Sequence, residues 1–186
     1  MLGGFSGWSS PTPTVRTLVR RIVLGSDMPA GSSQTPEFDV PQTGRHLRIY
    51  FYNCRTDSAS HNLYLTANFN ADTTAANYQN AIFFAVTGWS GAQQANTGAA
   101  YFGRVSGTAD AASIGGTGMV IVSNYTDLGF ARTWLSDAVY ANSTTQITGL
   151  FTYGFWTNTT SPILSMHFGL SGGNFVSGSF DIFVER

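Results

Sequence analysis

The sequence predicts an all-β fold: a two-sheet antiparallel sandwich of the jelly-roll type, preceded by a short extended N-terminal arm. Apolar and polar residues alternate in many short segments, which is the pattern of strands with one buried and one exposed face. Segments rich in Gly, Ser, Asn and Pro separate these runs at regular intervals, as in sandwiches and barrels. The composition agrees, since 14% of the 186 residues are aromatic, 21 are glycine and only 10% are charged.

Residues 1–14, MLGGFSGWSSPTPT, carry no charge and show neither a helical nor a strand period. We expect them to form the arm, and residues 15–186 to form the sandwich domain. Leu2, Phe5 and Trp8 recur every three residues. This spacing leaves two interpretations open: an arm that docks onto a partner through these side chains, or a loose terminus.

The first half of the sandwich is predicted from four segments. Residues 15–24 alternate in part and predict a strand, and a short strand at 37–40 interrupts a connection rich in Gly, Pro and Ser. Residues 46–54 predict a strong strand, and residues 61–70 show the clearest alternation. One face of this last strand would carry Leu63, Leu65, Ala67 and Phe69, and the other Asn62, Tyr64, Thr66 and Asn68.

The second half continues the same pattern. Further strands are predicted at 78–87, 99–106, 117–124, 131–141, 146–157, 162–170 and 178–185. The total is then about nine to eleven strands, with a helical turn expected only within 72–84. The chain is longer than a minimal immunoglobulin sandwich and lacks its Cys…Trp…Cys spacing. Eight or more strands around one core favour the jelly roll.

The last segment, LSGGNFVSGSFDIFVER, predicts a strand that closes the sandwich. Phe180, Ile182 and Val184 alternate with polar residues and would face the core. The glycines at 172–173 and 178 precede no helix, so a phosphate-binding loop is not supported. They are better interpreted as turns that set the register of the final strand.

The residues that usually bind metals are not spaced as ligands. His46, His61 and His167 show neither of the H-x-x-x-H and H-x-H spacings that bring two imidazoles to one ion. The single cysteine, Cys54, excludes an intrachain disulfide and a thiolate zinc cluster, and its expected role is that of a small apolar residue in a strand. We therefore expect no metal and no cofactor.

Carboxylate pairs give little support for catalysis. Glu37 and Asp39 share a strand face at period two, and Asp181 and Glu185 lie close to the C-terminus. Glycoside hydrolysis or calcium binding would need such pairs, but in a turn-rich connection they are more often solvated. The chain also lacks a G-x-S-x-G elbow. We expect no catalytic residues.

Among the tryptophans, Trp89 is the candidate for ligand contact. It falls in the predicted loop TGWSG, where an exposed ring could stack on a sugar or anchor a protein interface. Trp134 and Trp156 fall in predicted strands, where core packing is the expected role.

All nine basic residues are arginine, and three of them, Arg16, Arg20 and Arg21, fall on the first strand. Two interpretations stay open: pairing with carboxylates at a fixed interface, or protection of an edge strand. The formal net charge of -1 gives no electrostatic reason to expect nucleic acid or an anionic membrane as a partner. We expect no signal peptide and no transmembrane helix. Low charge with many aromatic residues favours a surface covered by copies of the same chain or by partners.

Three motifs carry a resemblance to a known family. GRHLRIYFYNCRTD, LYLTANFNADTTAANY and LSGGNFVSGSFDIFV together resemble a β-sandwich module of tailed-phage virion proteins, from about residue 17 to residue 184. The matching positions are His46, Leu47, Arg48, Phe69, Asn70, Asp72, Asn77, Tyr78, Gly173, Asn174, Phe175, Gly178 and Ser179. Ala71 stands where the family has glycine, and the chain ends in FVER instead of a Tyr-Gly pair.

The resemblance implies a non-enzymatic protein of the virion surface, often a homotrimer, that is assembled in the host cytoplasm. A compact module with a short arm and no coiled-coil heptads favours a capsid decoration (cement) protein that contacts itself and the major capsid protein. The alternative is a tail, baseplate or fibre component that binds a host receptor or surface glycan. The family supplies no catalytic residues to transfer.

Overall fold

The computed structural model describes residues 14–24, 26–28, 31–59, 63–85, 89–95, 97–110, 114–144 and 146–186. The strands are β1 Arg16–Val23, β2 Phe38–Asp39, β3 His46–Thr56, β4 Tyr64–Phe69, β5 Tyr78–Ala85, β6 Trp89–Ala95, β7 Ala100–Arg104, β8 Gly116–Ser123, β9 Arg132–Ala141, β10 Ile147–Trp156, β11 Ser165–Leu170 and β12 Phe175–Glu185. One 3-10 turn, η1 at Ala75–Asn77, falls where a helical turn was expected. Nowhere in these ranges is there a helix with the length and apolarity that crossing a membrane requires.

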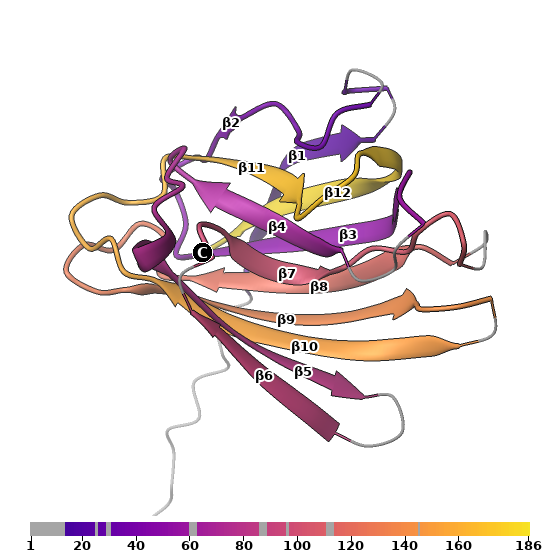
Figure 1. The fold of residues 1–186 in the computed structure, drawn as a ribbon. Helices are drawn as coiled ribbons and strands as arrows, with labels where there is room; N and C mark the ends of the chain where they lie inside the picture. Colours follow the sequence, from indigo (N-terminus) through magenta and orange to yellow (C-terminus); the bar gives the residue numbers. More distant parts are fainter. Residues whose placement is uncertain are drawn as a thin grey trace, which may run out of the picture.

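The predicted antiparallel two-sheet sandwich is confirmed. One sheet, the large sheet, has the order β1-β12-β3-β8-β9-β10-β5-β6, and the small sheet has the order β2-β11-β4-β7. In Figure 1 β11, β4 and β7 of the small sheet lie above β9, β10, β5 and β6 of the large sheet, and β1 and β12 of the large sheet are seen beside β11. The described part of the chain holds one strand more than the prediction allowed, because β6 forms where a loop was expected.

Two hairpins account for the width of the large sheet. β5–β6 follows β4 in the chain, β9–β10 follows β8, and β10 pairs with β5 in full register from Gly149↔Ala85 to Trp156↔Tyr78. The two hairpins thus extend the large sheet beyond β8 (Figure 1). The other eight strands divide equally between the two sheets.

Aromatic side chains fill the space between the sheets. Phe168 of the small sheet stacks on Phe180 of the large sheet with ring centroids 4.1 Å apart. Phe69 contacts both Trp134 and Trp156 edge-on, at 6.1 Å and 5.7 Å. Trp134 and Trp156 are buried, so the core role expected for them is confirmed.

The C-terminal strand lies between β1 and β3, inside the large sheet. Phe180, Ile182 and Val184 are buried, as predicted. Gly178 is not in a turn, as had been expected, but at an irregularity within β12 where the register shifts. Its φ is +122°, and a Cβ there would lie 2.7 Å from the Cα of Cys54. The left-handed φ and this close approach explain the glycine.

The motif residues at the end of β4 fix a turn and are not arranged around a ligand. The Asp72 carboxylate accepts hydrogen bonds from Trp156 Nε1 and Asn77 Nδ2, both at 2.7 Å. The Tyr78 hydroxyl accepts from the backbone N–H of Phe69 and donates to the Asp72 carbonyl. Burial opposes ionisation of Asp72, but these hydrogen bonds outweigh it and hold its pKa below the ordinary value.

Candidate interaction face

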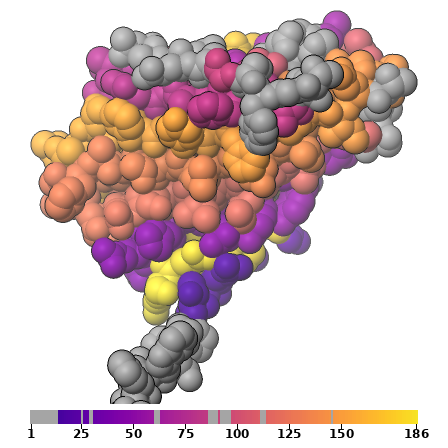
Figure 2. Space-filling view, turned by 90° about the horizontal axis from the view of Figure 1, so that it is seen from below, coloured from indigo at the N-terminus to yellow at the C-terminus, as the bar shows by residue number. Residues whose placement is uncertain are grey.

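The outer face of the large sheet is unusually apolar. Residues that point away from the core align across neighbouring strands in straight rows. One row runs through Leu18, Phe183, Arg48, Ile121, Leu135, Tyr153 and Ala81. Figure 2 looks onto this face, with β10, β9 and β8 running across its middle.

We call the following residues the apolar face: Tyr50, Phe83, Met119, Ile121, Leu135, Val139, Phe151, Tyr153 and Phe155. Leu135 is 53% exposed, Tyr153 49% and Val139 44%. Apolar side chains scattered singly over a surface are ordinary, but here they adjoin one another over several strands. A contiguous exposed apolar patch marks a site of interaction.

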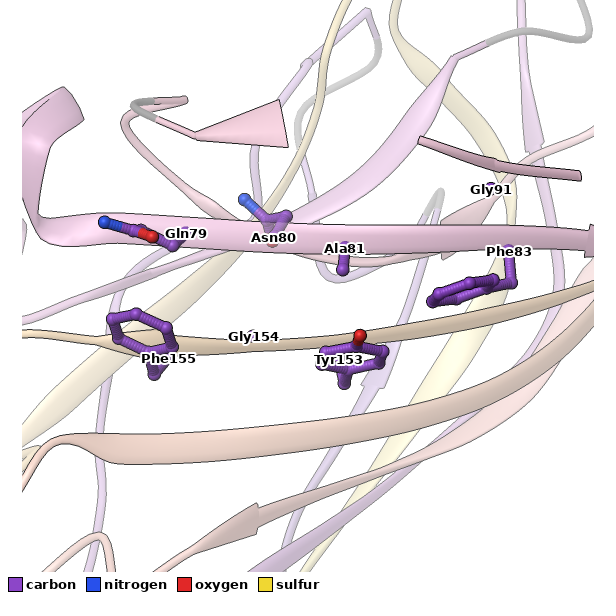
Figure 3. Close-up of a pocket in the computed structure, with 8 residues that line it drawn as sticks. All are labelled: Gln79, Asn80, Ala81, Phe83, Gly91, Tyr153, Gly154 and Phe155. Atoms are coloured by element: carbon purple, nitrogen blue, oxygen red, sulfur yellow. The ribbon is translucent and has the colours of Figure 1, made fainter. Parts of the chain in front are cut away.

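A hollow of about 410 Å³, which we call the aromatic hollow, lies over β10, β5 and β6 (Figure 3). The Tyr153 and Phe83 rings stack with centroids 5.7 Å apart and planes 16° apart. Ala81 lies opposite Tyr153 in the ladder, and its small side chain leaves the space open. Phe155 and Gln79, which are also paired, close one end.

Among the described residues that line it, the aromatic hollow carries no charged side chain. Asn80 contributes to its lining, but its amide points to the other side of the sheet and bonds Thr97, the Ala99 carbonyl and the Tyr101 N–H (Figure 3). The other polar side-chain groups of the described lining are the Gln79 amide and the Tyr153 hydroxyl. The arrangement suits flat apolar or aromatic groups with a polar edge.

A second hollow, of about 320 Å³, lies on the same face over β3, β8 and β9. Its lining includes Tyr50, Tyr52, Met119 and Val139. Asp137 also lines it and is the charged residue nearest the centre of the apolar face. Both hollows therefore belong to one continuous surface.

Ion pairs border the apolar face on the side of β1. Glu185 accepts hydrogen bonds from Arg48 Nε at 2.6 Å and Arg16 Nε at 2.5 Å, and Asp181 pairs with Arg21 at 2.6 Å. The hydrogen bond from Arg48 holds the pKa of Glu185 below its ordinary value, and that from Arg21 does the same for Asp181.

The arginines of the first strand are thus engaged within the chain. Arg16 and Arg21 attach β1 to carboxylates of the neighbouring strand β12. The third, Arg20, lies over the Phe38 ring at 5.5 Å from its centroid. Of the two interpretations of these arginines, pairing with carboxylates describes Arg16 and Arg21, although the carboxylates belong to the same chain.

Five other predicted candidates remain. Four of them, Leu2, Phe5, Trp8 and His61, lie outside the described residues. Trp89 was expected in a loop, and that was wrong: it opens β6, which pairs along β5 from Ala85↔Trp89. Its side chain is not described.

The candidate metal and acid–base residues do not converge. His46 lies on β3 of the large sheet and His167 on β11 of the small sheet, where burial lowers the pKa of His167. Glu37 accepts a hydrogen bond from the Ser165 hydroxyl, and Asp39 pairs with Ser165 in the ladder. In the ranges that the structure covers, no three His, Cys, Asp or Glu side chains gather as metal ligands would.

Sequence reasoning missed the apolar face, although the sequence holds a signal for it. In β10, ITGLFTYGFW, the alternate positions Phe151, Tyr153 and Phe155 are apolar, and so are Leu150 and Trp156 on the opposite face. Apolar residues at both parities are the pattern of a strand whose two faces are both apolar. In comparisons with protein families, curated proteins and solved structures, nothing matches this chain.

Proposed function

We propose that this chain is a non-enzymatic structural protein of a phage particle, most specifically a capsid decoration protein that self-associates on the particle surface. The observation that carries the proposal is the apolar face. A contiguous patch of exposed aromatic and aliphatic side chains marks a surface that contacts a partner. A second copy of the chain is the occupant we propose.

The size of the face is sufficient for a stable contact. It extends over the five strands β3, β8, β9, β10 and β5. Strands about 4.8 Å apart and about 30 Å long give roughly 700 Å² of flat area. A standard interface buries about 800 Å² on each partner. A contact of this face with a neighbouring copy would therefore reach the area of a specific complex.

The strand order supports a jelly roll. Without the two inserted hairpins, eight strands remain, β1, β2, β3, β4, β7, β8, β11 and β12. The first, eighth, third and sixth of them form one sheet, and the second, seventh, fourth and fifth form the other. This is the pairing of a jelly roll, a fold that builds viral capsid and lectin domains. Together with the motif resemblance, it favours a virion surface role.

Sedimentation of the purified chain tests self-association. We expect an oligomer, with a trimer as the specific expectation, and at least about 30-fold weaker association in Leu135→Glu because a residue at an interface centre is worth 2 kcal/mol or more. The matched control is Leu164→Glu, since Leu164 is similarly exposed at 49% but precedes β11 of the small sheet. A monomeric parent chain would refute this part of the proposal.

Quantitative mass spectrometry of purified particles tests the location. Decoration requires a copy number that follows the capsid lattice. A small symmetric number of copies, confined to the tail, would instead favour the adaptor or fibre assignment. Failure to co-purify with particles would overturn both.

The aromatic hollow favours a second candidate function, binding of a host surface glycan by a tail or fibre component. Tyr153 and Phe83 present flat rings, and Gln79 presents an amide at the rim. Such a platform could stack on the apolar face of a sugar and bond its hydroxyls. Titration with surface polysaccharide tests it, and binding that survives in Tyr153→Ala would exclude this hollow as the sugar site.

A further inference from the structure

We infer that the N-terminal segment of this chain, residues 1–13, docks in cis across one end of the large sheet, with Trp8 and Phe5 filling the aromatic hollow. The inference concerns one margin of the apolar face. It leaves Tyr50, Met119, Ile121 and Leu135 uncovered, so it goes beyond the proposed self-association and does not depend on it.

The ladder defines the path. Arg16 begins β1, directly after the segment, and its row crosses the sheet to the aromatic hollow. The row runs through Arg16, Glu185, His46, Ser123, Thr133, Phe155 and Gln79. Phe155 and Gln79 are the residues that close one end of the hollow. The segment therefore enters the sheet on the same row as the hollow, several strands away.

The length of the segment matches the distance. β10 is the fifth strand beyond β1 in the sheet, and five spacings of about 4.8 Å give about 24 Å. Trp8 precedes Arg16 by eight residues, which in an extended chain cover about 25 Å. Phe5 lies three residues further, about 9 Å, or two strands. Trp8 would reach Phe155 on β10, and Phe5 would reach the hollow over β5 and β6.

The row and the segment both change from polar to aromatic residues, and the two changes fall at corresponding positions. Over β12, β3, β8 and β9 the row is polar, with Glu185, His46, Ser123 and Thr133, and it becomes aromatic at Phe155. In the segment, the polar and proline residues of SSPTPT adjoin Trp8. The part that crosses the polar strands is thus polar, and the part that reaches the hollow is aromatic.

Two further properties agree. The segment carries no charge, and neither does the lining of the aromatic hollow. Pro11 and Pro13 fix φ at values that favour an extended chain, which reduces the entropy lost on docking.

Disulfide trapping in the full chain tests the inference. Ser6→Cys with Gln79→Cys places one thiol between Phe5 and Trp8 and the other at the end of the hollow. The control pair, Ser6→Cys with Thr117→Cys, uses a residue of the same outer face at the far end of β8. Cys54 does not compete, because burial raises its pKa to about 12.

We expect the Gln79 pair to oxidise at least about tenfold faster than the control pair, because a disulfide needs Cα atoms within about 7 Å. The bond should form within one chain, at a rate independent of protein concentration. Trp8→Ala in the same background should slow it. Equal rates for the two pairs, bonds only between chains, or no effect of Trp8→Ala would overturn the inference. Sedimentation of the same samples reports on self-association separately.

Discussion

The two outer faces of this sandwich differ sharply, although the strands beneath them alternate in the same way. On the small sheet most outer residues of β4 and β11 are polar or small, namely Thr66, Asn68, Ser165, His167 and Gly169, and the outer aromatic residue Tyr64 stacks on Tyr101 of β7. Those of the large sheet include Leu135, Phe151 and Tyr153. Alternation therefore shows which residues face the core, but it does not determine whether the outer residues are polar or apolar. The difference agrees with the self-association that we propose for the outer face of the large sheet.

The chain itself completes the outer face of the small sheet. The Asn68 amide donates to the carbonyls of Asp72 and Gly98, and Gln34 forms a bridge with Gly169. Thr66 and Asn68 are consequently buried. On the large sheet, no such cover is present among the residues that the structure describes, and Tyr153 stays half exposed.

The largest expected effect separates core aromatics from those of the apolar face. Phe168→Ala removes a ring that stacks between the sheets, and we expect a loss of about 3–5 kcal/mol in the free energy of unfolding. Tyr153→Ala should cost less than about 1 kcal/mol in the separated chain, because its ring is half exposed. Denaturant unfolding at low protein concentration measures both. Comparable losses would mean that the apolar face stabilises the single chain.

Two glycines of β10 allow the inner and outer faces of the large sheet to be compared directly. A Cβ on Gly154 would meet the Gln79 carbonyl at 2.1 Å and the Trp134 ring at 2.4 Å. We expect Gly154→Ala to destabilise by about 1–3 kcal/mol through overpacking. The control, Gly149→Ala, faces outward with its nearest atom at 3.6 Å, and should stabilise by roughly 0.5 kcal/mol. Thermal unfolding measures the two shifts, and the same sign for both would contradict this assignment of the faces.

The smallest effect concerns the charged border. The pKa of Glu185 is lowered by the hydrogen bond from Arg48, so its contribution to stability is present above the unfolded value of about 4.5 and is lost as the pH falls below it. The pair with half-exposed Arg16 should add at most about 1 kcal/mol. Unfolding free energies from pH 7 to pH 3 should therefore decline less in Glu185→Gln than in the parent chain. An identical slope would show that Glu185 does not carry this dependence.

The sequence predicted most strands because their periodicity is local. In β4 the alternation of Leu65 and Phe69 with Thr66 and Asn68 separates the core side from the outer side, as the structure has it. β6 was missed because WSGAQQA has no apolar alternation. At the edge of the sheet it pairs only with β5, so few contacts constrain its sequence.

The apolar face could not be predicted in the same way. It depends on β10 pairing with β5, two strands that are far apart in the chain. Local periodicity does not report which strands become neighbours, and the aromatic hollow requires Tyr153, Phe83 and Gln79 to meet across that pair. From the sequence alone, Phe151, Tyr153 and Phe155 could equally have been covered by another layer of strands or helices of the same chain.

The two inserted hairpins give the protein a modular design. Six of the nine residues of the apolar face lie on the two hairpins, and the other three, Tyr50, Met119 and Ile121, lie on β3 and β8. The aromatic hollow lies entirely on β10, β5 and β6. Each hairpin leaves and rejoins the eight-strand path without altering its order. Outward substitutions on the hairpins can therefore change what the molecule contacts while the route of the remaining strands is conserved. The strands that would determine what the molecule contacts and the strands that maintain its fold are thus different parts of one sheet.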